Sequence, residues 1–99
     1  MANNFSGDGN CVALWNLESG ALTTDSKGTN TLTNATFAED TTNYKQGACS
    51  GLSIRSESDR MYITNANLNS GFPLKSGETN YTFSVAFWVK FTGTITDSQ

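Results

Sequence analysis

The sequence predicts an all-β protein, and the clearest signal for this fold is the segment 81–91. Every second side chain in it is a Phe or a Val, namely Phe83, Val85, Phe87, Val89 and Phe91. Alternation with a period of two, in a run rich in aromatic and β-branched residues, is typical of a long β-strand. Composition agrees: 36% of residues are hydrophobic and only 15% are charged, which lacks the high net charge typical of disorder. No segment has the i, i+3, i+4 apolar spacing of a helix.

Four shorter strands are predicted before the segment 81–91. They cover residues 12–17, 31–37, 47–55 and 60–64. Polar loops at 22–30, 38–46 and 65–79 separate them, and residues 1–10 form a flexible, Gly-rich lead-in. Within the third strand, Gly47 and Gly51 are candidate positions for a bulge or a close approach of backbone.

The predicted core collects the strand residues that best fit apolar, inward-facing positions. Phe83 and Phe87 are expected to be among the most buried residues of the chain. The full set is Trp15, Leu17, Leu52, Ile54, Ile63, Phe83, Val85, Phe87 and Val89.

Charge and hydropathy exclude several classes of partner. The net charge is −3 and the basic residues are scattered, so no basic stripe is present to bind nucleic acid. The chain contains no run of about 18 apolar residues, so no membrane-spanning helix is predicted. The first residues lack the basic and apolar regions of a signal peptide. Either a leader has been removed, or the protein leaves its cell by another route, as virion components do.

Cys11 and Cys49 both fall in or beside predicted strands. Neither belongs to a Cys-x-x-Cys motif and the chain has no His, so a zinc site is not predicted. A cross-strand disulfide is one interpretation. The favoured one is two unbonded thiols that pack as small apolar groups, because strand positions rarely meet the Cα separation of a disulfide.

The order of several short motifs resembles a known superfamily. They are Ala-Leu-Trp-Asn-Leu at 13–17, Asp-Ser-Lys-Gly-Thr-Asn at 25–30, Thr-Leu-Thr at 31–33, Gln-Gly-Ala at 46–48 leading to Leu52, Met-Tyr-Ile at 61–63, and Tyr-Thr-Phe-Ser-Val-Ala-Phe-Trp-Val-Lys at 81–90. Over roughly residues 10–92 the chain resembles the N-terminal half of the laminin G-like, concanavalin A-like lectin and glucanase superfamily. It is most similar to modules of bacterial surface proteins and of phage tail or fibre proteins.

This resemblance implies a jelly-roll sandwich of antiparallel sheets, of which residues 11–99 would be the N-terminal part. The strand at 81–91 then needs further partners, because a long apolar strand requires pairing at its edges and a sheet over its face. We therefore expect it to associate with the remainder of its own domain or with another copy of the chain.

The resemblance also implies a calcium-binding loop at Asp25 and Asn30, since Ca²⁺ prefers several oxygen ligands. The residues themselves favour a simpler interpretation, an Asx-turn whose side chains accept local main-chain N–H groups, with Gly28 at positive φ. Possible cofactors are thus limited to Ca²⁺.

Aromatic residues are the candidates for ligand binding. Tyr44 and Tyr62 lie near predicted turns, and Trp88 could stack on a sugar ring. Trp15 could do the same, although packing is the favoured interpretation for both tryptophans because they lie in apolar strands.

Catalysis is not predicted. Glu57 and Asp59 form a close acidic pair between predicted strands, but Met61 stands where a glucanase of the superfamily has its third acidic residue. Without His, no Ser-His-Asp triad can form within the chain. The expected function is a non-catalytic recognition or adhesion module that binds a glycan or a surface protein, outside the cell, at its surface or on a virion. The alternatives are a structural module of a fibre, tail or envelope and, remotely, a fragment of a glycoside hydrolase.

Overall fold

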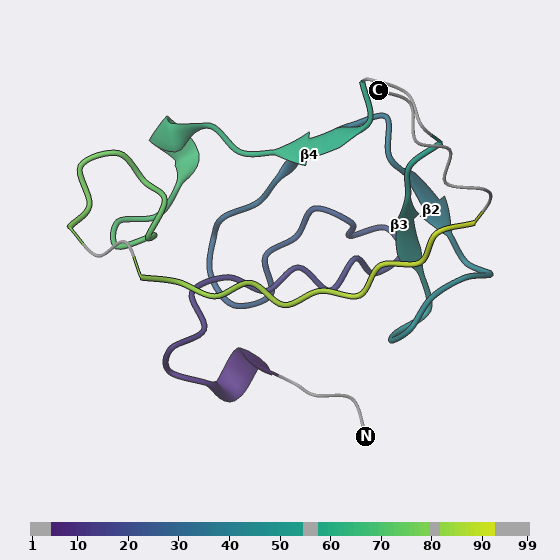
Figure 1. Cartoon of the computed structure of the whole chain (residues 1–99), viewed down its shortest axis with the longest axis horizontal. Coiled ribbons are helices and arrows are strands. Elements are labelled where there is room, and N and C mark those ends of the chain that lie inside the picture. Colours follow the sequence, from purple (N-terminus) through teal and green to yellow (C-terminus); the bar gives the residue numbers. More distant parts are fainter. Residues whose placement is uncertain (1–4, 55–57, 80–81, 93–99) are drawn as a thin grey trace.

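A computed structural model describes residues 5–54, 58–79 and 82–92. These residues form a mostly β fold with two small antiparallel sheets and two single-turn 3₁₀ helices (Figure 1). In chain order the elements are η1 (Phe5–Gly7), β1 (Thr33–Ala35), β2 (Ala38–Asp40), β3 (Ser50–Leu52), β4 (Arg60–Tyr62) and η2 (Asn65–Asn67). None of the helices in these ranges is long and apolar enough to cross a membrane.

The two sheets are connected by a sharp turn between consecutive strands. Strand β1 pairs with β4, with Asn34 opposite Met61, whereas β2 pairs with β3. Asn34 fixes the turn, because its Oδ1 accepts the Phe37 N–H at 3.0 Å and its Nδ2 donates to the Phe37 carbonyl at 2.9 Å. Thr36 lies between them at φ 70°, in the left-handed region that non-Gly residues rarely adopt. The chain therefore changes sheets within two residues.

Strands predicted at 31–37 and 47–55 are confirmed in their centres, as β1 and β3, and the strand predicted at 60–64 is confirmed in its first three residues, as β4. The predicted strand at 12–17 is wrong: only Trp15 forms a bridge, to Asp25, and Leu17 at φ 55° breaks the extended path. The predicted loop at 38–46 contains β2, which the sequence did not indicate because Glu39 and Asp40 are poor strand formers. Its pairing with β3 overrides that preference.

Gly51 in β3 is a point of close approach, but the groups that approach it are side chains and not the backbone that was predicted. A Cβ at this position would lie 3.2 Å from Cδ1 of Phe37 and 3.3 Å from Cε of Met61. Since both contacts are tighter than ordinary van der Waals packing, a larger residue would push the two side chains away from β3. The glycine thus allows the side chains of Phe37, beside β2, and Met61, in β4, to pack over β3.

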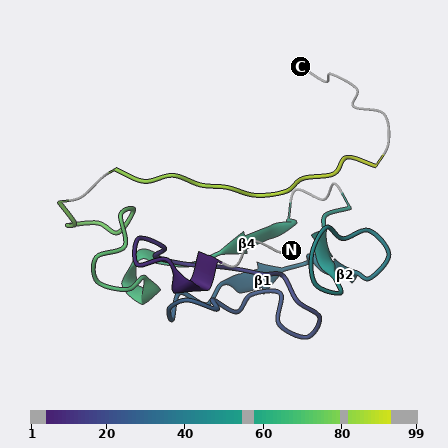
Figure 2. The same cartoon turned by 90° about the horizontal axis from the view of Figure 1, so that it is seen from below.

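The strand predicted at 81–91 is wrong for its described residues: the segment 82–92 is extended but belongs to neither sheet. Within 83–92, no main-chain group is hydrogen-bonded to another main-chain group. Figure 2 shows the segment running along one side of the molecule, apart from the layer that contains β1, β2 and β4. It reaches that layer through side chains: Nζ of Lys90 donates to Oδ1 of Asn43 at 2.5 Å.

The predicted core is wrong in its largest members. Phe83 is 49% exposed and Phe87 is 77% exposed. Ile54, Val85 and Val89 are exposed as well, whereas Trp15, Leu17, Leu52 and Ile63 are half-buried. The apolar residues that are buried are instead Leu22, Cys49, Leu68 and Pro73.

The physical reason is that no sheet among the described residues covers the segment 82–92 or pairs with its edges. The radius of gyration is 14.9 Å, compared with about 13 Å for a compact chain of about 100 residues. A closed sandwich around Phe83 and Phe87 is therefore not formed within the described part of the chain.

Cys11 and Cys49 are unbonded, in line with the favoured interpretation. Cys11 is half-buried and its thiol donates to the Ala13 carbonyl at 3.5 Å, whereas Cys49 is buried and donates to the Ser50 carbonyl at 3.3 Å. Burial raises the pKa of the Cys49 thiol, and the nearby carboxylate of Glu39 raises it further. Cys49 therefore behaves as a small packing residue rather than as a reactive thiolate.

Candidate functional site

A buried polar cluster surrounds the carboxylate of Asp25, which is only 6% exposed. Its Oδ1 accepts hydrogen bonds from the N–H groups of Leu14 and Lys27, each at 2.9 Å. Its Oδ2 accepts the main-chain N–H and the side-chain amide of Asn30, both at 3.0 Å. The Asx-turn predicted at 25–28 is thus present. The same carboxylate also binds the N–H group of Leu14, which lies outside the turn.

Asn30 is fully buried, at 0% exposed, and connects this turn to two other segments. Its carbonyl accepts the indole N–H of Trp15 at 2.9 Å, and its Oδ1 accepts the N–H of Asn69 at 2.9 Å. Thr29 adds a second link, because its hydroxyl donates to Oδ1 of Asn69 at 2.6 Å. Three stretches of chain that are far apart in sequence are therefore held together at one point.

Gly28 is required here for space rather than for its backbone conformation. The prediction of a positive φ at Gly28 is wrong, since its φ is not among the positive values. A Cβ at this position would instead lie 3.0 Å from Oδ2 of Asp25 and 3.3 Å from Nδ2 of Asn30. Neither atom is free to move away, because both belong to the buried hydrogen bonds of the cluster.

Asp25 and Asn30 come together as predicted, but their arrangement does not fit a cation. A carboxylate offers about four acceptor sites, and the four N–H donors already occupy them. Burial raises the pKa of Asp25, but the main-chain and amide donors outweigh burial and bring the pKa to about 2. Among the described residues, no three His, Cys, Asp or Glu side chains gather around a possible metal position. Calcium binding at this loop stays a prediction, and it would require these hydrogen bonds to open.

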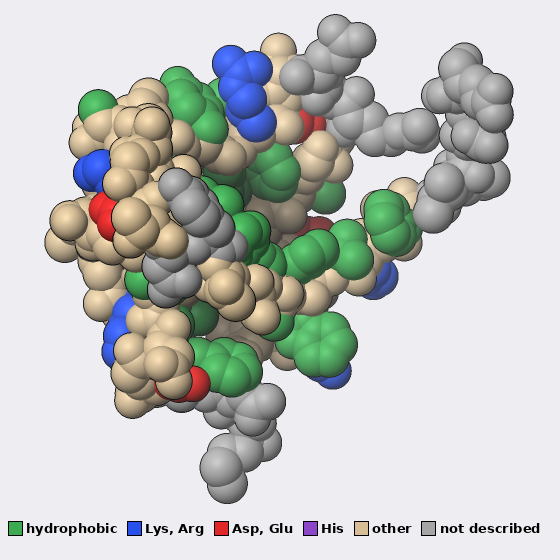
Figure 3. Space-filling view, turned by 60° about the vertical axis from the view of Figure 1, so that its left-hand side comes forward, with side chains coloured by type: hydrophobic (Ala, Val, Ile, Leu, Met, Phe, Trp, Pro, Cys, Tyr) green, Lys and Arg blue, Asp and Glu red, His purple; other side chains and the backbone are tan. Residues whose placement is uncertain are grey.

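A second feature is a wide, open cavity of about 1610 Å³ between the segment 82–92 and the rest of the chain. Its walls combine half-buried apolar residues such as Trp15, Phe37 and Leu52 with aromatic residues at its edge. Both Tyr44 and Trp88 line it, so two of the three predicted ligand-binding residues share one cavity. The space-filling view shows hydrophobic side chains uncovered on this side of the molecule (Figure 3).

Trp88 is 78% exposed, so the favoured prediction that it packs in a core is wrong. Nζ of Lys45 lies 5.1 Å from the centroid of the Trp88 ring, within the range of a cation–π contact. Polar residues line the same cavity, including Asp40, Thr42 and Asn43, and the Asp40 carboxylate accepts the N–H groups of Thr42 and Asn43. An exposed indole with polar neighbours is an arrangement that can stack on a ring and orient it by hydrogen bonds.

The other two aromatic candidates are placed differently. Tyr62 in β4 is exposed, but its ring contacts the guanidinium of Arg60 at 5.4 Å and does not line the cavity. Trp15 is half-buried and its indole N–H is already bonded to Asn30, which agrees with the packing interpretation. The candidate site is therefore the Tyr44 and Trp88 cavity, without Tyr62.

Of the acidic pair, Glu57 lies outside the described residues. Asp59 is described, and its carboxylate accepts hydrogen bonds from the hydroxyls of Thr36 at 2.5 Å and Ser53 at 3.0 Å and from the Ile54 N–H at 2.8 Å. Its oxygens thus stabilise the turn after β3.

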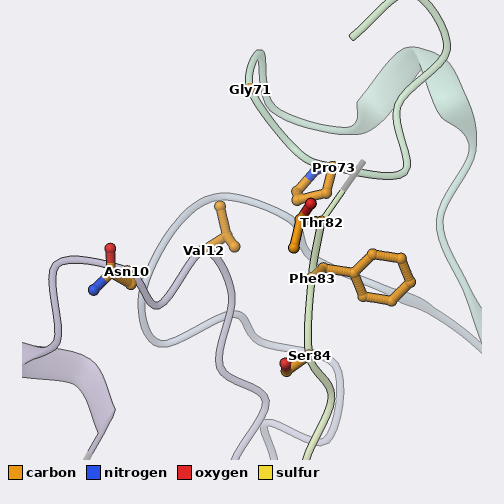
Figure 4. Close-up of a pocket in the computed structure, with 7 residues that line it drawn as sticks. All are labelled: Asn10, Val12, Gly71, Pro73, Thr82, Phe83 and Ser84. Atoms are coloured by element: carbon orange, nitrogen blue, oxygen red, sulfur yellow. The ribbon is translucent and has the colours of Figure 1, made fainter. Parts of the chain in front are cut away.

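A smaller cavity of about 430 Å³ lies at the other end of the segment 82–92 (Figure 4). It is lined by Asn10, Val12, Gly71, Pro73, Thr82, Phe83 and Ser84. In the close-up the Phe83 ring points away from Val12, and Asn10 stands apart from the other side chains. None of these lining residues carries a charged side chain, so the cavity offers no carboxylate or amine for acid–base chemistry.

Comparisons with protein families, with curated proteins and with solved structures gave no match for this chain.

Several residues of these two features were not predicted from the sequence. Leu14 and Asn69 bind the polar cluster through main-chain N–H groups, which carry no side-chain signal. Lys45 and Asn43 were assigned to a polar loop, although an aromatic residue flanked by a cation and an amide, as at Tyr44, is a pattern that could have directed attention to them.

Proposed function

We propose that this protein is a non-catalytic recognition module whose ligand is a glycan displayed at a cell or virion surface. The observation that carries the proposal is the exposed Trp88 ring at the edge of the same open cavity as Tyr44. Sugars present apolar ring faces together with hydroxyl groups, so an exposed indole in a cavity that carboxylate and amide side chains also line is complementary to them. The alternative ligand for the same cavity is a surface protein.

The resemblance to laminin G-like and concanavalin A-like modules supports the same class of function. It also implies that the whole domain is a jelly roll. Under this proposal the protein acts outside the cell, at its surface or on a virion. The two small antiparallel sheets are compatible with part of such a sandwich, and the segment 82–92 would be one strand of a further sheet.

A glycan array with the 99-residue chain tests the proposal, with and without millimolar calcium. We expect binding to at least one glycan class, and we expect Trp88→Ala and Tyr44→Ala each to weaken that binding by about tenfold or more, as large buried aromatic contacts do. Tyr62→Ala is the matched control, because it removes another exposed tyrosine, one that lies outside the cavity, and the variant should bind like the original chain. Failure to bind any glycan, or unchanged binding by Trp88→Ala, would contradict the proposal.

The second candidate function is a structural module that assembles with other chains in a fibre, tail or envelope. One observation favours it: the main chain of 83–92 makes no hydrogen bond to other main-chain groups in the described part of the molecule. An extended segment with open edges is a template for pairing with another strand. This function requires no ligand, so a chain that assembles but binds nothing in the array would select it.

A further inference from the structure

The segment 83–91 presents open edges and exposed side chains along its whole length. Its main-chain groups make no hydrogen bond to other main-chain groups, and each of its residues is exposed. Extended backbone of this kind binds another extended segment by main-chain hydrogen bonds, with side chains at alternate positions deciding the partner and the register.

The order of side chains in this segment is symmetric about Phe87. Reading outward in both directions, the same face carries Val85 and Val89, and then Phe83 and Phe91. In an antiparallel pair with two-fold symmetry, a residue before the axis lies opposite the residue equally far after it. A palindromic face therefore meets a second copy of itself with like residues opposite like.

We propose that two copies of this chain pair antiparallel through residues 83–91, with the two-fold axis at Phe87. Phe83 of each copy then lies opposite Phe91 of the other, Val85 lies opposite Val89, and the two Phe87 side chains lie opposite each other. Aromatic pairs and pairs of β-branched residues are the cross-strand contacts that stabilise antiparallel sheets most.

The opposite face of the segment fits the same register. The large Trp88 lies opposite the small Ala86, and the cationic Lys90 lies opposite Ser84 rather than opposite another Lys90. No like charges are therefore apposed. A register shifted by one residue would place Phe87 opposite Trp88. The Phe and Val residues of one copy would then lie opposite the other set of side chains, which includes Ser84 and Lys90.

The phenylalanines of the palindromic face have surface available for such a pair. Phe83, Phe87 and Phe91 are 49%, 77% and 69% exposed. Each can therefore pack against its cross-strand partner in the second copy. The pairing holds whether or not a glycan binds.

The first test is the oligomeric state in analytical ultracentrifugation at tens of micromolar. We expect the original chain to sediment as a dimer and Phe87→Asp to sediment as a monomer, because that change places two carboxylates opposite each other at the axis. Ser84→Asp is the matched control on the same segment: it adds the same charge opposite Lys90 and should remain dimeric. A monomeric original chain overturns the proposal, and so does a dimer that Phe87→Asp leaves intact.

The second test fixes the register by oxidation with diamide. Residues opposite each other in an antiparallel pair have Cα atoms about 4.5–5.5 Å apart, which a disulfide can bridge. Phe87→Cys should therefore give a dimer linked through that position, identified by mass spectrometry of the linked peptide so that Cys11 and Cys49 do not confuse the result. Phe83→Cys should give no such link, because its two copies lie about 27 Å apart at ~3.4 Å per residue. Equal linking at both positions overturns the register.

Discussion

Asp25→Ala is expected to destabilise the chain more than any other single substitution, by about 3 kcal/mol or more. The substitution leaves the N–H groups of Leu14, Lys27 and Asn30 and the Asn30 amide without their acceptor. Each buried donor without a partner costs about 1–3 kcal/mol. Small domains are stable by only about 5–15 kcal/mol, so the variant should be largely unfolded or unfold at much lower urea concentration.

The measurement is urea unfolding followed by tryptophan fluorescence. Asp8→Ala is the matched control, because Asp8 also accepts a local main-chain N–H, from Asn10 at 2.8 Å, but is exposed to water. We expect the control to change the free energy of unfolding by no more than about 0.5 kcal/mol. Equal effects of the two substitutions would show that the cluster around Asp25 does not hold the three segments together.

Acid is expected to destabilise the fold through the same carboxylate. The pKa of Asp25 in the folded chain is about 2, below its ordinary value of 3.8, because burial, which raises it, is outweighed by the N–H donors. A lowered folded pKa means that the folded state favours the charged form. The stabilisation is therefore fully present above the unfolded pKa near 4, and it is lost as the pH falls towards 2. At 1.36 kcal/mol per pKa unit, the loss is about 2 kcal/mol.

Urea midpoints measured across this range of pH check the effect. Asp25→Asn has nearly the same shape without the titrating group. Its amide nitrogen faces two of the N–H donors, so the urea midpoint of this variant starts lower, but it should change less with pH than that of the original chain. Glu39 and Asp40 contribute in the same direction, since hydrogen bonds from Gly20 to Glu39 and from Asn43 to Asp40 lower the pKa of each carboxyl. If the two proteins lose stability in parallel between about pH 4 and pH 2, Asp25 is not the group responsible.

Local sequence patterns predicted the elements whose structure depends on local preferences. Parts of three predicted strands form β1, β3 and β4, and the Asx composition at Asp25 predicted the turn that is found there. The alternation at 81–91 predicts only an extended backbone whose Phe and Val side chains share one face. It says nothing of whether a partner strand is present, and so the burial predicted for Phe83 and Phe87 is wrong.

The candidate sites show the same limit. Asp25 and Asn30 are five residues apart, and their contact is predictable from turn chemistry. Their links to Leu14 and Asn69 depend on tertiary structure, since Asn69 is 39 residues from Asn30. Trp88 is ambiguous for a related reason: the same indole in an apolar strand is a packing residue under a second sheet and a binding residue without one.

Hydrogen–deuterium exchange of the main-chain amides tests the central claim most directly, namely that a layer held by the Asp25 cluster carries an open segment at 83–91 that is available to a partner. At low micromolar concentration we expect the amides of Leu14, Lys27 and Asn30 to exchange slowly and those of 83–91 to exchange fast. At tens of micromolar and above, the amides of 83–91 should become protected while those of the cluster stay unchanged. Protection of 83–91 at the lowest concentration, where the chain is monomeric, would contradict the account, as would amides in the cluster that exchange as fast as those of 83–91.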